Sequence, residues 1–211
     1  MTSEVKKVES VSTTEARAEA SGDSNEVIPK HPLQNQWQLW YFRPGARGSA
    51  WEDNLLDVTH FDTVEDFWAL YNHIELASHL NAGSDYSVFK YGIRPMWEDE
   101  KNKAGGRWLF TFNKKATSGR QIDETWLEVL LCLIGEAFGE DSDQICGAVI
   151  NIRAKMDKIS VWTNDFKRVQ SITNIGKILK QRTGYTPGIT YEAHSDTIVK
   201  TGSMAKHLLQ L

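Results

Sequence analysis

The chain has 211 residues, a net charge of −4 and 40% hydrophobic side chains. This length and balance are typical of one globular domain, and no apolar run reaches the ~20 residues that a membrane-spanning helix needs. The negative charge argues against a protein that coats nucleic acid without regard to sequence. With only Cys132 and Cys146, we expect neither a disulfide framework nor a thiolate metal site, and therefore a reducing compartment, the cytoplasm or the nucleus.

The charged side chains occur in blocks along the chain. Residues 52–85 carry eight acidic side chains and residues 121–146 carry seven, and neither segment contains Lys or Arg. Residues 94–120 hold seven basic against three acidic side chains, and residues 147–182 hold eight against two. This alternation predicts a folded surface with an acidic side and a basic side, which suits two different partners.

The amino-terminal part divides into a tail and the start of a domain. Residues 1–30 are rich in Ser, Thr, Glu, Ala and Lys and contain no aromatic side chain, so we predict a disordered tail there and a folded domain over 31–211. From Gln34 to Arg43, dense aromatic and aliphatic side chains alternate as in a strand. The Gly- and Pro-bearing residues 44–50 predict a loop that delivers Trp51.

A first helix is predicted after Asp62, which is an N-cap candidate with Glu65 three residues later. Apolar side chains follow at helical spacing, and the centre of the apolar stripe is formed by Phe67, Leu70, Tyr71 and Ile74. Val64 and Trp68 lie together at one edge of that stripe. This helix therefore has more apolar surface than its core-facing stripe requires.

A second helix is predicted from about Ile122 to Phe138, with an apolar surface wider than one core-facing stripe. The side chains that can face the core are Trp126, Val129, Leu130 and Leu133. Leu127 and Leu131 are then left towards the far edge. Two helices with spare apolar edges, each in an acidic block, predict a groove for a partner helix.

The remaining elements are mostly strands. Residues 106–114, 148–155 and 159–163 are predicted strands, and the last two form a hairpin through residues 156–158. A third helix is predicted from Asp165 to about Arg182 and is ended by Gly184 and Pro187. Its inward residues are predicted to be Val169, Ile172, Ile175 and Leu179. A short strand near Ile189 and a loop from His194 to His207 follow. This order predicts an antiparallel sheet with helices on one face.

No motif of a common enzyme class is present: the chain lacks a phosphate-binding loop, a dinucleotide fingerprint, HExxH, GxSxG and CxxC. We therefore expect no catalytic residue, cofactor or metal ion. The predicted hairpin is more informative, because its polar face gathers Arg153, Lys155, Lys158 and Trp162. That face is either an ordinary solvated surface with one half-buried Trp or a phosphate clamp beside an aromatic ring.

A second candidate site lies in the irregular segment that contains Trp97 and Glu98. An indole can stack on a base while a neighbouring carboxylate accepts the N1–H and N2–H of guanine, a donor pair that guanine alone offers among the bases. A second loop tryptophan such as Trp51 would complete a sandwich, and N7-methylation would add a cation–π contribution. The alternative is that Trp97 belongs to the core and Glu98 is solvated.

Five longer runs connect these features. The chain closely resembles the eukaryotic cap-binding translation initiation factor family in HPLQNQWQLWYF (31–42), FDTVEDFWALYNHI (61–74), MWEDEKNKAGGRW (96–108), WLEVLLCLIGE (126–136) and CGAVINIRAKMDKISVWT (146–163). The resemblance extends in register from about His31 to Ser203. It implies a single α+β domain, in which three helices cover the convex face of a curved antiparallel sheet and the ligand lies in the concave face.

The resemblance also implies how the 7-methylguanosine cap of messenger RNA is bound. The matching positions are Trp51, Trp97, Glu98, Arg107, Arg153, Lys155, Lys158 and Trp162. It implies a guanine between Trp51 and Trp97 that pairs with Glu98, while Trp162 packs near the N7-methyl group. Arg153 and Lys158 match direct phosphate ligands, and Arg107 and Lys155 match supporting ones. Asn151 matches a residue that helps to hold the arginine.

On the opposite face, the family binds a helical Tyr-x-x-x-x-Leu-hydrophobic motif. Scaffold initiation factors and small inhibitory binding proteins share this motif. The matching positions are His31, Pro32, Leu33, Val64, Trp68, Leu127, Glu128 and Leu131. Ser203 matches a regulatory phosphorylation site. Apart from these partners we expect a monomer with no membrane association.

Three functions remain to be compared. The first is an initiation factor that joins the cap to a scaffold, and the second is a cap-binding repressor that uses the same fold with a silencing partner. The third is a cap-cleaving hydrolase, which usually needs carboxylates and a divalent metal at the phosphates, where this sequence offers cations. The intact Trp68, Leu127 and Leu131 favour the first function.

Overall fold

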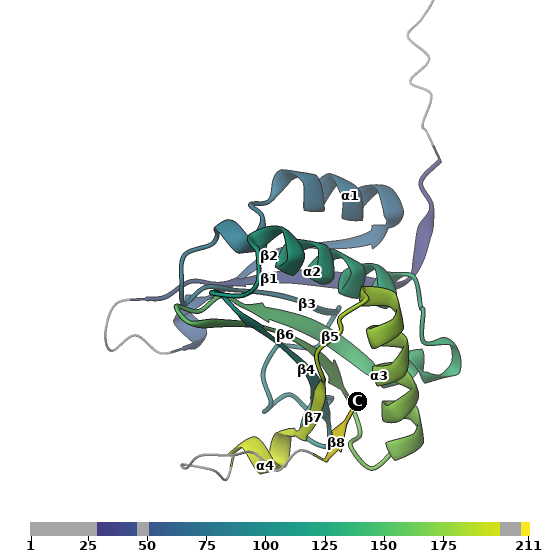
Figure 1. The fold of residues 1–211 in the computed structure, drawn as a ribbon. Helices are drawn as coiled ribbons and strands as arrows, with labels where there is room; N and C mark the ends of the chain where they lie inside the picture. Colours follow the sequence, from purple (N-terminus) through teal and green to yellow (C-terminus); the bar gives the residue numbers. More distant parts are fainter. Residues whose placement is uncertain (1–28, 46–50, 199–207) are drawn as a thin grey trace, which may run out of the picture.

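The computed structural model describes residues 29–45, 51–198 and 208–211 as a curved antiparallel sheet with helices packed on one face (Figure 1). Eight strands form the sheet in the order β2-β1-β3-β5-β6-β4-β7-β8. In chain order they are β1 Pro32–Phe42, β2 Leu55–Thr63, β3 Asp85–Lys90, β4 Gly106–Asn113, β5 Ile145–Asn151, β6 Met156–Thr163, β7 Thr190–Ala193 and β8 Leu209–Gln210. The predicted fold class is confirmed.

Three long helices, α1 Val64–His73, α2 Gly119–Ile134 and α3 Val169–Thr183, cover the convex face (Figure 1). A short helix, α4 His194–Ile198, follows β7 where a loop was predicted. Short 3-10 helices occupy Glu52–Asn54, Ala77–His79 and Gly139–Gln144. None of the helices in the described ranges is long and apolar enough to cross a membrane.

The core lies between the helices and the convex face of the sheet. It includes the predicted inward residues Trp126, Val129, Leu130 and Leu133 of α2, together with Ile172, Ile175 and Leu179 of α3. From the sheet, the alternating Ala148, Ile150, Ile159 and Val161 are fully buried beneath them. The alternation along the hairpin predicts one apolar face of these four side chains with Ile152 and Ala154, and this is confirmed except for Ala154, which is exposed in the turn. Val169 was predicted to face inward, but it is exposed because it stands at the first turn of α3.

The helix boundaries differ from the prediction where local capping decides them. Thr63, not Asp62, caps α1: the helix begins at Val64, and the Thr63 hydroxyl directly before it accepts a hydrogen bond from the Asp66 backbone N–H at 3.1 Å. The second helix begins after Ser118, whose hydroxyl accepts from the Gln121 N–H. The second helix ends at Ile134, four residues before the predicted end at Phe138. Gly184 ends α3 in a left-handed conformation, as predicted, with φ of 62°.

The hairpin turn lies earlier in the chain than predicted. The fifth strand ends at Asn151 and the sixth begins at Met156, so residues 152–155 form the turn instead of 156–158. Ile152 remains fixed by backbone bonds on both sides, because its N–H donates to Ser84 and its carbonyl accepts from Gly83. Arg153 and Lys155 consequently project from a turn and not from a strand face.

Candidate functional site

The strand register places polar and aromatic side chains together on the concave face. Across β1, β3, β5, β6 and β4, one row consists of Phe42, Asp85, Asn151, Lys158 and Thr111. Four residues further along β6, Trp162 pairs with Arg107 of β4. Both positions lie on the same side as the first row, because side chains alternate with a period of two. The predicted hairpin residues Lys158 and Trp162 thus share this face with residues from distant parts of the chain.

A cavity of about 490 Å³ opens on the concave face. Of the eight predicted cap-binding residues, five line it: Trp51, Trp97, Glu98, Arg107 and Trp162. The rest of its wall is formed by Phe42, Glu52, Leu55, Asp85, Ser87, Pro95, Met96, Val149, Asn151 and Ser160. Trp51 is 45% exposed and Trp97 is 40% exposed, so neither indole belongs to the core. Two large ring faces are thereby available beside one cavity.

Trp51 is presented by the connection between β1 and β2. Its ring stacks on Phe42 with centroids 5.5 Å apart and an angle of 19° between the planes. The Asn54 N–H donates to the Trp51 carbonyl, and the Arg43 N–H donates to the Asn54 carbonyl, each at 3.1 Å. The stack on Phe42 and the 3-10 turn that follows Trp51 therefore help to hold this indole at the cavity.

Trp97 and Glu98 lie in the turn-rich segment between β3 and β4. The Trp97 indole N–H donates a hydrogen bond to Glu98 Oε1. Because this N–H lies in the ring plane, the carboxylate sits at the edge of the indole and leaves the ring face uncovered by it. An ionised carboxylate has about four acceptor positions, so Glu98 can still accept two further N–H groups from a ligand.

The floor of the cavity is aromatic and rigid. Trp162 is buried, donates its indole N–H to Ser160 Oγ at 3.1 Å and packs against Phe89 with ring centroids 5.5 Å apart. Behind it lies His194, whose ring centroid is 4.2 Å from that of Trp162. Burial and the nearby charge of Arg107 lower the pKa of His194 to about 3, so this ring is neutral at physiological pH. The neutral His194 ring packs against Trp162 and adds no charge to the cavity floor.

Arg153, Lys155 and Lys158 lie beside one end of the cavity, next to Asp85 and Asn151 of its wall. The Arg153 guanidinium binds both carboxylate oxygens of Asp85, with Nη2 and Oδ2 3.1 Å apart, and also donates to the carbonyls of Ser84 and Ile152. The side chain that holds this arginine is therefore Asp85, where the resemblance implied Asn151. Lys155 is exposed in the same turn. None of Arg153, Lys155 and Lys158 lines the cavity itself, although Asp85 and Asn151 beside them do.

Arg107 lies at the other side of the floor, where its guanidinium pairs with Glu192 at 3.3 Å. Sequence analysis missed the contributions of Phe42, Asp85, Glu192 and His194. No motif or spacing marks these residues. The fold brings Phe42 and Asp85 to the cavity wall and places Glu192 and His194 against Arg107 and Trp162. Ser203 lies outside the described residues, as does most of the predicted tail.

The predicted partner surface lies on the convex face, where α1 and α2 run side by side (Figure 1). Phe67 and Leu70 of α1 and Trp126 and Leu130 of α2 line a small gap between the two helices. Trp68 is 37% exposed and packs edge-on against Phe67 beneath it. Val64 is exposed, whereas Leu127 and Leu131 are half-buried at the margin of the core. Both helices thus keep apolar side chains accessible, as predicted.

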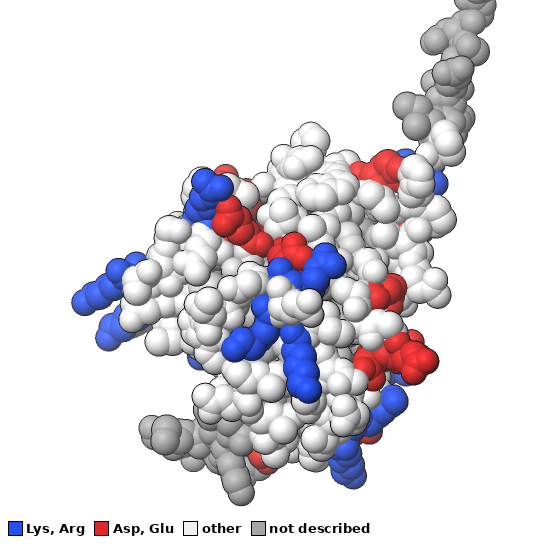
Figure 2. Space-filling model, turned by 45° about the vertical axis from the view of Figure 1, so that its right-hand side comes forward, with Lys and Arg blue, Asp and Glu red and all other residues white. Residues whose placement is uncertain are grey.

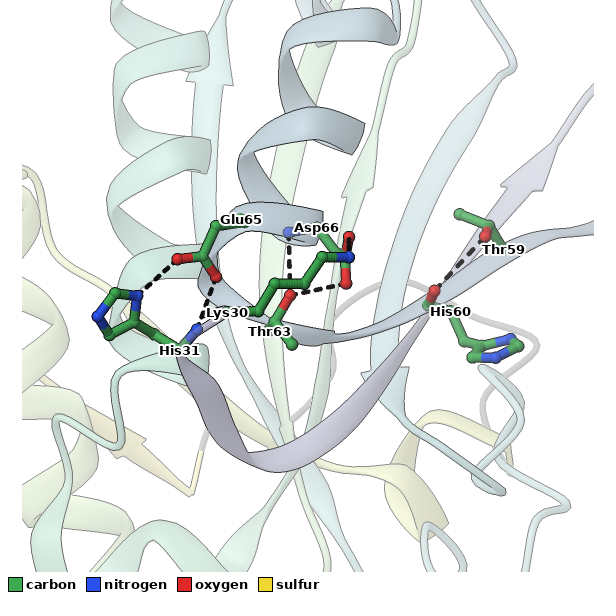
Figure 3. A network of polar contacts seen from close by, with 7 residues as sticks. All are labelled: Lys30, His31, Thr59, His60, Thr63, Glu65 and Asp66. Atoms are coloured by element: carbon green, nitrogen blue, oxygen red, sulfur yellow. Dashed lines mark hydrogen bonds and ion pairs between the residues drawn. The ribbon is translucent and has the colours of Figure 1, made fainter. Parts of the chain in front are cut away.

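A polar network fastens the segment before β1 to the start of α1 (Figure 3). The Glu65 carboxylate accepts hydrogen bonds from the His31 ring at 2.6 Å and from the His31 backbone N–H at 2.9 Å. These bonds lower the pKa of Glu65 to about 2, so the carboxylate is ionised at neutral pH. Lys30 pairs with Asp66 at 2.6 Å, and the Val64 N–H donates to the His31 carbonyl. The network places His31, Pro32 and Leu33 next to α1.

Charges of both signs meet on the face that contains α3. Figure 2 shows Lys and Arg side chains near the middle of this face with Asp and Glu side chains beside them. Arg182 of α3 pairs with Glu128 of α2 at 2.9 Å. The sequence blocks therefore do not separate into one acidic and one basic side on this face.

Comparison with known proteins adds the family context. The family model described as "Eukaryotic initiation factor 4E" matches residues 32–208. The eukaryotic translation initiation factor 4E of Xenopus laevis is 54% identical over 180 residues, 84% of each chain. The human relative of the same name is 52% identical over 196 residues, 92% of this chain and 88% of the relative.

Solved structures agree with this assignment. Ascaris suum eIF4E-3 in complex with the m7G cap has a TM-score of 0.80 and 48% identity, and the match covers 87% of this chain and 98% of that chain. Caenorhabditis elegans eIF4E-3 in complex with the 4E-binding protein Mextli and a cap analogue has a TM-score of 0.79 and 47% identity, with coverage of 87% and 100%.

Proposed function

Because the chain belongs to the eukaryotic initiation factor 4E family, we propose that it binds the 7-methylguanosine cap of messenger RNA and recruits a scaffold initiation factor to start translation. It is an initiation factor and not an enzyme. The observation that carries the proposal is the concave cavity, in which two accessible tryptophans and a carboxylate lie above an aromatic floor. The related structures contain cap analogues and 4E-binding proteins.

In the proposed complex the methylated guanine lies between the rings of Trp51 and Trp97. Glu98 accepts the guanine N1–H and N2–H, two charge-assisted hydrogen bonds that no other base can supply as an adjacent pair. The positive charge of the N7-methylated ring strengthens stacking through a cation–π contribution. Trp162, at the floor, provides an apolar surface for the methyl group. Methylation and guanine identity are thus recognised by different groups.

The triphosphate extends towards the β5–β6 turn. Arg153 and Lys158 contact the phosphates directly, and Arg107 and Lys155 contribute supporting charge. Asp85 binds the Arg153 guanidinium with both carboxylate oxygens and so holds it in a fixed orientation beside the cavity. The phosphates then meet a cation that has already lost much of its conformational freedom.

Removal of a cationic side chain tests the phosphate contacts. We expect Lys158→Ala to weaken binding of 7-methyl-GTP by about 1–2 kcal/mol and binding of 7-methylguanosine much less, because the nucleoside lacks the phosphates. The salt dependence of 7-methyl-GTP binding should also become shallower. Fluorescence titrations of both ligands at several salt concentrations measure these effects.

The matched control is Lys177→Ala, which removes an exposed lysine from α3 on the opposite face. It should leave both affinities unchanged. If Lys158→Ala lost equal affinity for both ligands, this lysine would stabilise the fold and would not contact the phosphates.

The direct test of the function is retention on 7-methyl-GTP resin. The protein should stay on the resin in the presence of GTP and elute with free 7-methyl-GTP, since GTP lacks the cationic ring. Failure to bind, or elution by both nucleotides at equal concentrations, would remove the proposed specificity for the methylated cap.

The convex surface would accept the Tyr-x-x-x-x-Leu-hydrophobic helix of the scaffold and of small inhibitory proteins. The positions proposed for this role are His31, Pro32, Leu33, Val64, Trp68, Leu127, Glu128 and Leu131. We further propose a cytoplasmic location, where translation takes place, a phosphorylation site at Ser203 and a tail over residues 1–30 that precedes the cap-binding domain.

A further inference from the structure

The segment from Arg94 to Gly105 carries Trp97 and Glu98 without forming a long helix or a strand. Within this segment, Asn102 is fully buried. Its side-chain amide donates to the Arg94 carbonyl at 2.9 Å and to the Met96 carbonyl at 2.8 Å. Both hydrogens of the amide are therefore bonded to backbone carbonyls that precede Trp97 in the chain.

The same segment is fixed from its exposed side by Asp99. The Asp99 carboxylate accepts from the backbone N–H of Arg94 at 3.0 Å and from that of Lys101 at 2.9 Å. The Asn102 N–H donates to the Asp99 carbonyl at 2.9 Å, and the Gly105 N–H donates to the Asn102 carbonyl at 2.8 Å. The two ends of the segment are thus joined through side chains as well as backbone.

Gly105 allows the segment to lie close to the sheet. A β-carbon at this position would stand 1.8 Å from the Thr163 carbonyl oxygen, so no other residue fits without displacement of the backbone. Its own carbonyl accepts from the His194 N–H at 3.0 Å. The segment that carries Trp97 is consequently fixed to the same part of the sheet that holds the cavity floor.

We propose that Asn102 is a positioning residue for guanine recognition, because its buried amide fixes the backbone that presents Trp97 and Glu98. This inference rests on the proposed function of those two residues. Met96 directly precedes Trp97, so an amide bond to its carbonyl orients the peptide plane that leads into the indole. Two donors in fixed directions are needed, and an asparagine amide supplies both from one atom. Trp51, by contrast, stacks on Phe42.

The test is Asn102→Asp, which keeps the size of the side chain and removes both donors. We expect its affinity for 7-methyl-GTP to fall by about tenfold, because two carbonyls face a buried group that no longer donates to them. The loss for 7-methyl-ITP, which lacks the N2 amine, should be smaller. The preference for guanine over hypoxanthine should therefore decrease, a change that a general loss of stability does not produce.

The matched control is Asn164→Asp, since the Asn164 amide also donates to a backbone carbonyl, that of Asp143 at 2.9 Å, away from the cavity. Asn164→Asp should retain the parental preference for 7-methyl-GTP over 7-methyl-ITP. Glu98→Ala supplies the second comparison: in this background Asn102→Asp should no longer change the preference, because Asn102 acts through the pair that it positions. Binding of a Tyr-x-x-x-x-Leu-hydrophobic peptide should be unaffected in every variant.

An unchanged preference in folded Asn102→Asp would overturn the proposal, whereas failure of the parent protein to bind 7-methyl-GTP would overturn the proposed function instead. Should Asn102→Asp lose peptide binding and fold together, Asp99→Asn decides the question. It replaces one of the two carboxylate oxygens that accept the Arg94 and Lys101 N–H groups with an N–H₂ donor, and it should reduce the guanine preference in the same direction. If Asp99→Asn keeps the parental preference for guanine over hypoxanthine, the proposal that this segment positions Trp97 and Glu98 is contradicted.

Discussion

Glu98→Gln is expected to reduce the affinity for 7-methyl-GTP by about 3 kcal/mol, on the order of 100-fold. The carboxylate of Glu98 lines the cavity beside Trp97 and accepts the indole N–H there. Glutamine keeps the shape of the side chain, but it removes the negative charge and places an N–H₂ group where guanine also presents donors. One donor of the base would remain unpaired in a partly desolvated site, which costs more than the loss of an exposed hydrogen bond.

Fluorescence titrations with 7-methyl-GTP and 7-methyl-ITP measure this effect. Hypoxanthine lacks the N2 amine, so the variant should bind the two nucleotides with more similar affinities than the parent does. Glu100→Gln is the matched control, because it makes the same chemical change two residues away on a side chain that is 84% exposed. Parental affinity in Glu98→Gln would mean that another group recognises the guanine edge.

The parts of the fold that sequence analysis predicted well are those in which a periodic apolar pattern faces the core. Trp126, Leu130 and Leu133 of α2 are buried as expected. The strands β2 and β3 were missed for opposite reasons. Within β2 only Leu55 and Phe61 are buried and the five residues between them are exposed, so the apolar alternation of a strand is lost. All of β3 except its last residue is buried, including the polar Asp85 and Ser87, so its short alternation with Tyr86 and Val88 does not separate a core face from a solvent face.

Only those parts of the candidate site that are formed by residues adjacent in sequence could be predicted. Trp97 and Glu98 are adjacent in sequence, and their complementarity to guanine follows from the two residue types alone. The contact between Arg153 and Asp85 joins residues 68 positions apart and depends on the pairing of β3 with β5. His194 gives no sequence signal for a ring that supports Trp162. Such contacts are set by strand register, which a single sequence does not specify.

Trp68→Ala is expected to weaken binding of the partner peptide at the convex face without affecting cap binding at the concave face. The variant should bind a Tyr-x-x-x-x-Leu-hydrophobic peptide more weakly, with a loss of at least about 2 kcal/mol in binding free energy. Large accessible rings near the centre of an apolar groove are typical hot spots of binding. Its affinity for 7-methyl-GTP should remain parental. Trp68 lies on α1 at the convex face, whereas the cavity opens on the concave face and includes no residue of α1.

The reciprocal variant is Trp51→Ala, which should lose about 1–3 kcal/mol of cap affinity, the usual scale for a base stack, and keep the peptide. Its indole is exposed to a similar extent, 45% against 37% for Trp68, so both substitutions remove a comparable accessible ring. A fully buried tryptophan at position 68 would instead cost about 3–5 kcal/mol of fold stability when truncated. Thermal unfolding together with the two binding measurements distinguishes these cases. Loss of both ligands in Trp68→Ala, or a large drop in its unfolding temperature, would place this side chain in the core and contradict an independent partner site.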